Sequence, residues 1–199
     1  MSVCWLMIGD GRVDYHRRSL ASAETHVPRP DFEVVIDDSA HELGFAGAIA
    51  EGWRQVREIR PDWVFWIELD FTFNRDVPLD RMIAVMERHP NLAQICLLRQ
   101  AWNEEERRAG GIMQLHPEDY VQRVEAGDIW VEHRRHFSTN PCLISGALCA
   151  QGWPQEDQSE GKFTHRLLAD PAVRFAYWGA KADEPFVTHI GDERSGHGY

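Results

Sequence analysis

The sequence predicts an α/β domain in which helices flank a mostly parallel central sheet. Short apolar segments rich in β-branched and aromatic residues recur along the chain, and segments with helical spacing of apolar residues lie between them. The chain has 199 residues with 43% hydrophobic content, which suffices for a single domain with a substantial core. No internal repeat, low-complexity tract or long linker interrupts the alternation.

Four strands are expected in the first half of the chain. Each is a short apolar run that ends at a turn or at a polar cluster, which is the pattern of a buried strand. The four segments are Val3–Ile8, Phe32–Ile36, Trp63–Ile67 and Ala93–Leu98.

Two helices are expected between these strands. The apolar residues of Gly44–Ile59 recur at helical spacing, and this helix must end before Pro61, because the residue preceding a proline avoids the helical conformation. A second apolar stripe, running from Leu79 to Met86, predicts a helix that ends at the turn His89-Pro90-Asn91.

The second half of the chain is less regular. Arg99–Thr139 is polar and breaks its pattern often, with one helix expected near Pro117–Glu125. Beyond this region we expect a core segment at 142–149, a helix at Gly161–Leu168, a strand at Val173–Trp178 and a mobile tail at Gly191–Tyr199.

The composition argues against several function classes. A formal net charge of −11 disfavours broad electrostatic binding of nucleic acid, because an acidic surface repels the phosphates. No stretch approaches the roughly 18 apolar residues of a membrane-spanning helix, and the N-terminal segment lacks the pattern of a signal peptide. The four cysteines have no metal-binding spacing, so we expect reduced, buried thiols in a cytoplasmic protein.

Charged side chains follow three of the predicted strands. They are Asp10 and Arg12 after the first strand, Asp37 and Asp38 after the second, and Glu68 and Asp70 after the third. Because ligands of open parallel sheets bind beyond the carboxyl ends of the strands, these side chains are candidates for a binding site. Glu68 and Asp70 point the same way on an extended segment, and two such carboxylates suit a hard divalent cation. Taken alone, the triplet is very common and fits an ordinary strand-to-loop transition better than a metal site.

The order of several motifs resembles that of a known enzyme family. FEVVIDDS, GFAGAIAEGWRQ and PDWVFWIELDFTF follow one another as in the nucleotide-binding half of family 2 glycosyltransferases and their GT-A relatives. The later segment LISGALCAQGWPQEDQSEGKFTHRLLAD is similar to the acceptor side of that family. The resemblance implies a GT-A, Rossmann-like fold with one catalytic domain. Residues 1–98 would bind the nucleotide-sugar, residues 99–188 would bind the acceptor, and residues 189–199 would form a flexible tail.

The resemblance also implies roles for individual residues. The nucleotide would be contacted by Asp10, Arg12, Asp37, Asp38 and, from a tail that folds over the diphosphate, Arg194 and His197. The ligands of a Mn²⁺ or Mg²⁺ ion would be Glu68, Asp70 and His189, and the general base of an inverting reaction would be Glu160. The chain departs from the family pattern at Glu68, where Asp is usual, at the missing Gly of FEVVIDDS, and at Ser159, where an acid usually precedes the base.

Each assignment has a structural alternative. Asp38 would instead cap the following helix, Glu160 would be a first-turn acid stabilised by the helix dipole, and His189 would be a buried, hydrogen-bonded histidine. The tail would then be a disordered terminus. Three tryptophans in polar surroundings either stack on a sugar or belong to the core, namely Trp102, Trp130 and Trp153.

The function that the resemblance implies is transfer of a sugar from a UDP- or GDP-sugar to an acceptor that the sequence does not identify. A protein, a glycan or a small molecule suits this acidic chain better than a modified DNA base. Two alternatives remain open. One is a nucleotidyltransferase, for which Gly9-Asp10-Gly11-Arg12 would be a weak phosphate loop, and the other is a non-catalytic module that binds a nucleotide or a sugar.

Overall fold

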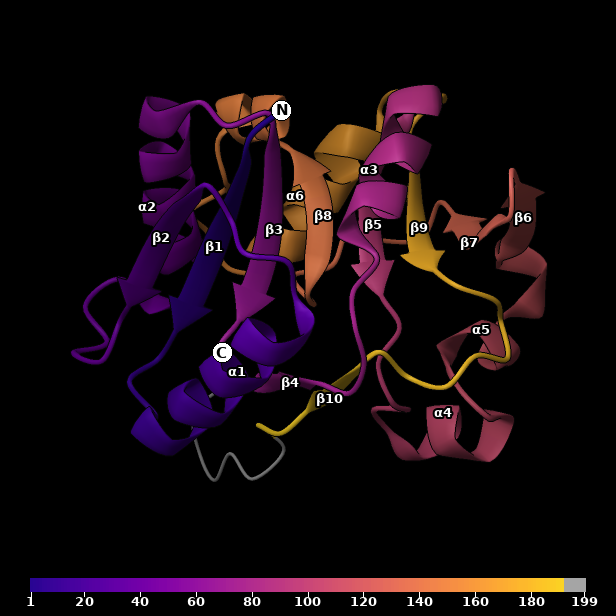
Figure 1. Ribbon diagram of the computed structural model, residues 1–199, viewed down its shortest axis with the longest axis horizontal. Coiled ribbons are helices and arrows are strands. Elements are labelled where there is room, and N and C mark those ends of the chain that lie inside the picture. The colour runs from indigo at the N-terminus through magenta and orange to yellow at the C-terminus, as the bar shows by residue number, and fades with distance from the viewer. Residues whose placement is uncertain (192–199) are drawn as a thin grey trace.

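A mixed eight-stranded sheet lies at the centre of the molecule (Figure 1). The computed structural model describes residues 1–191. In space the strands follow the order β2-β1-β3-β8-β5-β9-β7-β6. Their bounds are β1 Val3–Gly9, β2 Phe32–Asp37, β3 Trp63–Glu68, β5 Leu92–Leu97, β6 Val121–Glu125, β7 Asp128–His133, β8 Cys142–Ser145 and β9 Arg174–Trp178.

The direction of the strands agrees with the sequence only in part. β1 pairs in parallel with β2 and with β3, and β5 pairs in parallel with β9. β8 lies antiparallel between β3 and β5, and β7 is antiparallel to β9. The strands expected from the first half of the chain therefore share one direction, whereas β8 and β7 make the sheet mixed rather than mostly parallel.

Helices cover both faces of the sheet. α2 (Gly44–Ile59) and α6 (Ser159–Leu168) pack on one face, and α1 (Val13–His26) and α3 (Leu79–Arg88) pack on the other. The side chains of β1 alternate between the two layers, with Leu6 on the α2 side and Trp5 on the α3 side. This two-sided burial explains why the central strands read as continuous apolar runs.

The expectation of a helix near Pro117–Glu125 is wrong. Pro117–Asp119 forms a single 3₁₀ turn, and the residues after it form β6, which pairs with β7 in an antiparallel hairpin. Ala126 and Gly127 connect the two strands with φ values of 50° and 84°, the conformation of a two-residue hairpin turn. Pro117 and the acids after it suit a first helical turn, but the hairpin pairing outweighs this local preference. The same region also contains α4 (Glu104–Ala109) and α5 (Ile112–Leu115).

A separate two-stranded sheet lies beyond the end of β3. β4 (Phe71–Phe73) pairs antiparallel with β10 (Val187–His189), and His189 stands opposite Phe71. Figure 1 shows this pair near the carboxyl ends of β1 and β3. Within the described part of the chain, no helix has the length and apolar character needed to cross a bilayer.

Candidate functional site

A pocket of about 660 Å³ opens where β1 and β3 end. Seven of the side chains singled out from the sequence line it, namely Asp10, Arg12, Glu68, Asp70, Trp102, Glu160 and His189. The pocket thus brings together four side chains expected at strand ends with Glu160 and His189, which the family resemblance implied.

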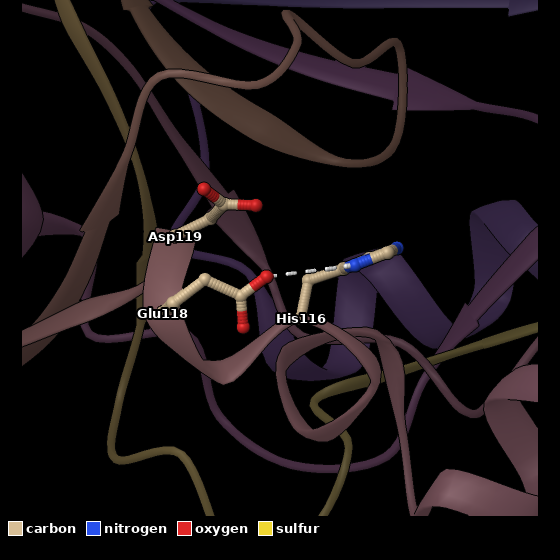
Figure 2. A group of neighbouring side chains, drawn as sticks. All are labelled: His116, Glu118 and Asp119. Atoms are coloured by element: carbon tan, nitrogen blue, oxygen red, sulfur yellow. Dashed lines mark ion pairs between the residues drawn. The ribbon is translucent and has the colours of Figure 1, made fainter.

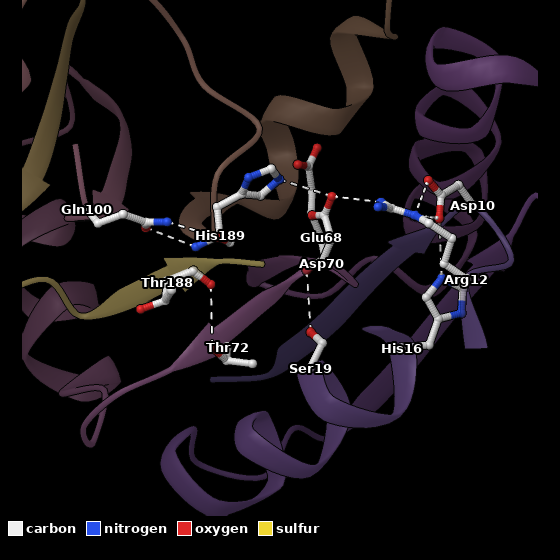
Figure 3. Close-up of polar contacts among 10 residues, drawn as sticks. All are labelled: Asp10, Arg12, His16, Ser19, Glu68, Asp70, Thr72, Gln100, Thr188 and His189. Carbon is white, nitrogen blue, oxygen red and sulfur yellow. Dashed lines mark hydrogen bonds and ion pairs between the residues drawn. The ribbon is translucent and has the colours of Figure 1, made fainter. Parts of the chain in front are cut away.

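Asp70 and His189 form the centre of this group (Figure 3). The His189 Nε2 nitrogen lies 3.1 Å from the Asp70 Oδ2 oxygen, and the two residues are only 8% and 5% exposed. Asp70 directly precedes β4, and His189 ends β10, so the pairing of these two strands holds the carboxylate beside the imidazole. The backbone N–H of Ile190 donates to the Asp70 carbonyl at 2.8 Å and extends this pairing by one residue.

His189 is fixed in place by Gln100 and by two aromatic rings. The Gln100 amide donates to the His189 carbonyl at 2.9 Å and accepts from the His189 backbone N–H at 2.9 Å. The imidazole packs against the rings of Phe71 and Trp102, with centroid separations of 4.6 and 4.4 Å. Because both its backbone and its ring are held in place, His189 is well oriented for a specific contact.

Arg12 connects the first strand end to Asp70. Its Nε donates to Asp10 at 2.8 Å, and its Nη2 donates to the Asp70 Oδ2 at 2.9 Å (Figure 3). Burial lowers the pKa of Arg12, but the hydrogen bonds and charges of Asp10 and Asp70 raise it more, so the guanidinium is always charged. Tyr15 lies beneath the guanidinium at 4.5 Å.

The donor set around Asp70 fits a divalent cation. A carboxylate oxygen and an imidazole nitrogen lie next to each other, and Mn²⁺ accepts both types of ligand. Gly191 borders them so closely that a Cβ there would lie 2.5 Å from the Asp70 Oδ2 and 3.0 Å from the His189 Nε2. The missing side chain leaves the space beside both ligand atoms open. Glu68 lines the same pocket but does not join Asp70 and His189 in a compact group of three ligand atoms.

A second cluster of potential ligands lies elsewhere. Within residues 1–191, His116, Glu118 and Asp119 are the only three such side chains whose ligand atoms lie within 4.8 Å of one another (Figure 2). Glu118 and Asp119 are exposed, and Asp119 forms an ion pair with Arg135. An exposed group of this kind on a 3₁₀ turn is ordinary surface, so the candidate site remains the pocket at Asp70.

Glu160 lines the pocket from the first turn of α6. Its Oε1 accepts a hydrogen bond from the Thr139 backbone N–H at 2.8 Å. Burial raises the pKa of Glu160, and the hydrogen bonds from Thr139 offset this only in part. A carboxylate with a raised pKa in a pocket is suited to proton transfer.

Asp37 and Asp38 lie outside the pocket lining. The Asp38 carboxylate accepts from the backbone N–H groups of Leu43 and Gly44 at 3.1 and 2.7 Å, and so holds the start of α2. Asp37 is exposed at the end of β2. Contact of this pair with a nucleotide therefore stays a prediction, as do the roles of Arg194 and His197, which lie outside the described residues.

The three tryptophans separate clearly. Trp130 and Trp153 are buried in the core, so a sugar-stacking role for them is wrong. Trp102 is 42% exposed and lines the pocket next to His189. Its backbone N–H donates to Glu106, which in turn forms a buried ion pair with Arg99 at 2.8 Å.

Sequence reasoning missed several residues that line the pocket, among them Arg99, His136, Asn140 and Tyr177. The His136 Nε2 lies 3.2 Å from the Tyr177 hydroxyl. Burial, with the neighbouring Arg135 and Arg99 charges, lowers the pKa of His136 to about 4, so the ring is neutral at neutral pH. These residues stand in irregular segments or within strands, where no spacing pattern distinguishes them from structural residues.

Solved structures of S. aureus TarS share this arrangement of strands and helices. TarS 1–349 in complex with UDP-GlcNAc matches with a TM-score of 0.64 at 13% identity, covering 99% of this chain and 60% of that one. TarS 1–349 in complex with UDP matches with a TM-score of 0.57 at 14% identity, covering 94% and 60%. A longer TarS structure matches with a TM-score of 0.52 at 12% identity, covering 96% and 37%. The chain therefore spans less than two thirds of the length of these proteins.

No protein-family description and no curated protein matches the sequence of this chain. The similarity to TarS thus lies in the three-dimensional arrangement, over nearly all of this chain. The fold predicted from the motifs is confirmed in its class, with a mixed sheet in place of a mostly parallel one. The chain has the GT-A fold that TarS also has.

Proposed function

We propose that the chain is a glycosyltransferase that takes its sugar from a nucleoside-diphosphate sugar, with a UDP-sugar as the first candidate. The observation that carries the proposal is the group of Asp70, His189 and Arg12 at the carboxyl ends of β1 and β3. This edge of a GT-A sheet is where a nucleotide is expected to bind. Support comes from the TarS structures of the same fold, which contain UDP and UDP-GlcNAc.

Within this proposal, Asp70 and His189 would hold a Mn²⁺ or Mg²⁺ ion, in a pocket that Glu68 also lines. The bound ion would neutralise the negative charge that develops on the departing diphosphate. Gln100 keeps the His189 ring in position, and Gly191 keeps the space beside it open. Arg12 supplies a further positive charge to the same region.

Glu160 acts as the general base on the acceptor. An acceptor hydroxyl attacks the anomeric carbon while the bond from that carbon to the diphosphate oxygen breaks, and the bonding electrons leave with the nucleoside diphosphate. The hydroxyl proton passes to the Glu160 carboxylate. A single displacement of this kind inverts the configuration of the sugar. The acceptor itself remains a protein, a glycan or a small molecule.

Calorimetric titration of the chain with UDP, with Mn²⁺ and with a chelator, tests the proposal. We expect UDP to bind more tightly with Mn²⁺, because the ion links the diphosphate to Asp70 and His189. Equal affinity in the chelator would contradict metal-dependent binding. Analysis of the products then separates the reaction types. Release of UDP from a UDP-sugar indicates glycosyl transfer, release of pyrophosphate from UTP and a sugar 1-phosphate indicates nucleotidyl transfer, and binding without any product indicates a non-catalytic module.

A further inference from the structure

We propose that Arg12 competes with the divalent cation for Asp70, so that the cation binds appreciably only together with the diphosphate. This inference rests on the proposed metal-dependent function and concerns the state before the donor arrives. The Asp70 Oδ2 is the oxygen that faces His189 at 3.1 Å, and it also accepts the Arg12 Nη2–H at 2.9 Å. The ligand atom nearest to the candidate metal nitrogen is therefore engaged by a guanidinium.

A guanidinium and a divalent cation on one oxygen repel each other. Mg²⁺ binds carboxylates at about 2.0–2.1 Å, so a metal ion on this Oδ2 would lie directly beside the Arg12 Nη2. Water screens their repulsion only weakly, because the Asp70 and Arg12 side chains are 7% and 27% exposed. An arginine guanidinium stays charged in proteins, so deprotonation offers no escape from the repulsion.

Arg12 is held in a way that allows it to leave Asp70 without leaving the pocket. Its Nε donates to both Asp10 oxygens at 2.8 Å, and its guanidinium lies 4.5 Å from the Tyr15 ring centroid. These contacts hold the stem of the side chain, whereas only Nη2 reaches Asp70. The buried Nη1 has no hydrogen-bond partner within residues 1–191. A diphosphate oxygen would accept from this group and draw the guanidinium away from Asp70.

The consequence is a coupled order of binding. Without a diphosphate, Arg12 remains on Asp70 and keeps the affinity for the cation low. With a diphosphate, the guanidinium turns to the phosphate oxygens, and Asp70 and His189 become available to the cation. Each ligand then raises the affinity for the other, as reciprocal linkage requires.

The experiment is a Mn²⁺ titration of the nucleotide-free chain, in which electron paramagnetic resonance measures the concentration of the unbound ion. Removal of the competing charge in Arg12→Gln should tighten Mn²⁺ binding by about tenfold or more relative to the wild type. Arg12→Lys keeps the charge and should bind Mn²⁺ nearly as weakly as the wild type. Arg17→Gln is the matched control, because Arg17 lies in the helix that follows Arg12 and pairs with Asp14 on the exposed surface. Thermal unfolding of each variant reports whether the fold persists.

The outcomes are distinguishable. Unchanged or weaker Mn²⁺ binding by a folded Arg12→Gln, or no binding by any variant, would overturn the inference. UDP titrations in a chelator add a second readout, because Arg12→Gln should bind UDP more weakly than the wild type does. Tight Mn²⁺ binding by Arg12→Gln without UDP binding by any form would remove the proposed function but retain the competition at Asp70.

Discussion

The Asp70 carboxylate and the His189 imidazole lie 3.1 Å apart, although 119 positions separate them in the sequence. The three-residue strands β4 and β10 bring them together, because Asp70 precedes one strand and His189 ends the other. Asp70 follows the end of β3 in the main sheet, and the small sheet adds the histidine. Because the two residues belong to different segments, substitutions can test the contribution of each one separately.

Asp70→Asn should abolish the effect of Mn²⁺ on UDP binding and leave the fold intact. The amide is a poor ligand for a divalent cation, so the gain in UDP affinity from Mn²⁺ should fall at least about tenfold. Titration calorimetry with Mn²⁺ and with a chelator measures this gain, and circular dichroism checks the fold. Asp14→Asn on the exposed face of α1 serves as the control. An unchanged Mn²⁺ effect in Asp70→Asn would show that the metal site lies elsewhere.

Gln100→Ala should weaken Mn²⁺-dependent UDP binding, although we expect Gln100 to contact neither the ion nor UDP directly. Gln100 makes two hydrogen bonds to the His189 backbone, and their loss allows the imidazole to shift away from Asp70. Loss of a positioning group of this kind typically costs about 10–100-fold in metal affinity. The measured quantity is UDP affinity as a function of Mn²⁺ concentration. A drop of the same size in the chelator would instead indicate a general structural defect.

The pattern of the central strands made much of the fold predictable. Residues 64–67 are buried alternately in the two core layers, so this apolar run marks a strand, and Glu68 at its end lines the pocket. The helix at Gly44–Ile59 has the predicted bounds. It ends there because the residue before Pro61 disfavours the helical conformation. Buried strands and amphipathic helices depend on patterns that one segment carries by itself.

The remaining features depend on contacts between distant segments. Phe71–Phe73 and Val187–His189 are too short for any periodicity, and only their mutual pairing makes them strands. The hairpin at Val121–Glu125 follows residues that suit a helix start, so local preference misleads there. The Asp38 oxygens accept hydrogen bonds from the backbone at the start of α2, and a contact of Asp38 with a nucleotide stays a prediction. A capping carboxylate and a ligand-binding carboxylate have the same sequence signature.

His133 should make the protein sensitive to acid. Burial, together with the charges of His136 and Arg135, lowers the pKa of His133 to about 2, whereas an unfolded histidine titrates near about 6.5. The folded pKa is below the unfolded pKa, so the unfolded state binds the extra proton as the pH falls. The stability present above about pH 6.5 is therefore lost toward lower pH, by up to about 1.4 kcal/mol per pH unit.

His133→Phe tests this acid sensitivity. The replacement keeps a ring against Tyr177, where the native rings stack at 5.2 Å, but removes the titrating group. We expect the free energy of unfolding, measured in urea between pH 7 and pH 5, to fall less steeply for this variant than for the wild type. The exposed His165→Gln is the control and should keep the wild-type slope. Equal slopes for all three proteins would assign the acid sensitivity to other groups.

Glu160→Gln should lower the turnover of a UDP-sugar but raise the stability of the fold. Gln cannot accept the acceptor proton, so turnover of a UDP-sugar should fall by about 10²–10⁴-fold while UDP affinity stays the same.

The carbonyl of Gln can still accept the hydrogen bond from Thr139, and the buried negative charge is gone. Because burial raises the folded pKa of Glu160, ionising it in the wild type lowers stability as the pH rises through that pKa. Glu160→Gln should therefore unfold at a higher temperature than the wild type at neutral pH, and the difference should shrink in acid, where the wild-type carboxyl is protonated. Thermal unfolding at both pH values and release of UDP measure the two effects. A variant with full turnover would exclude Glu160 as the base, and a variant with lower Tm at neutral pH would show that the carboxylate supports the fold.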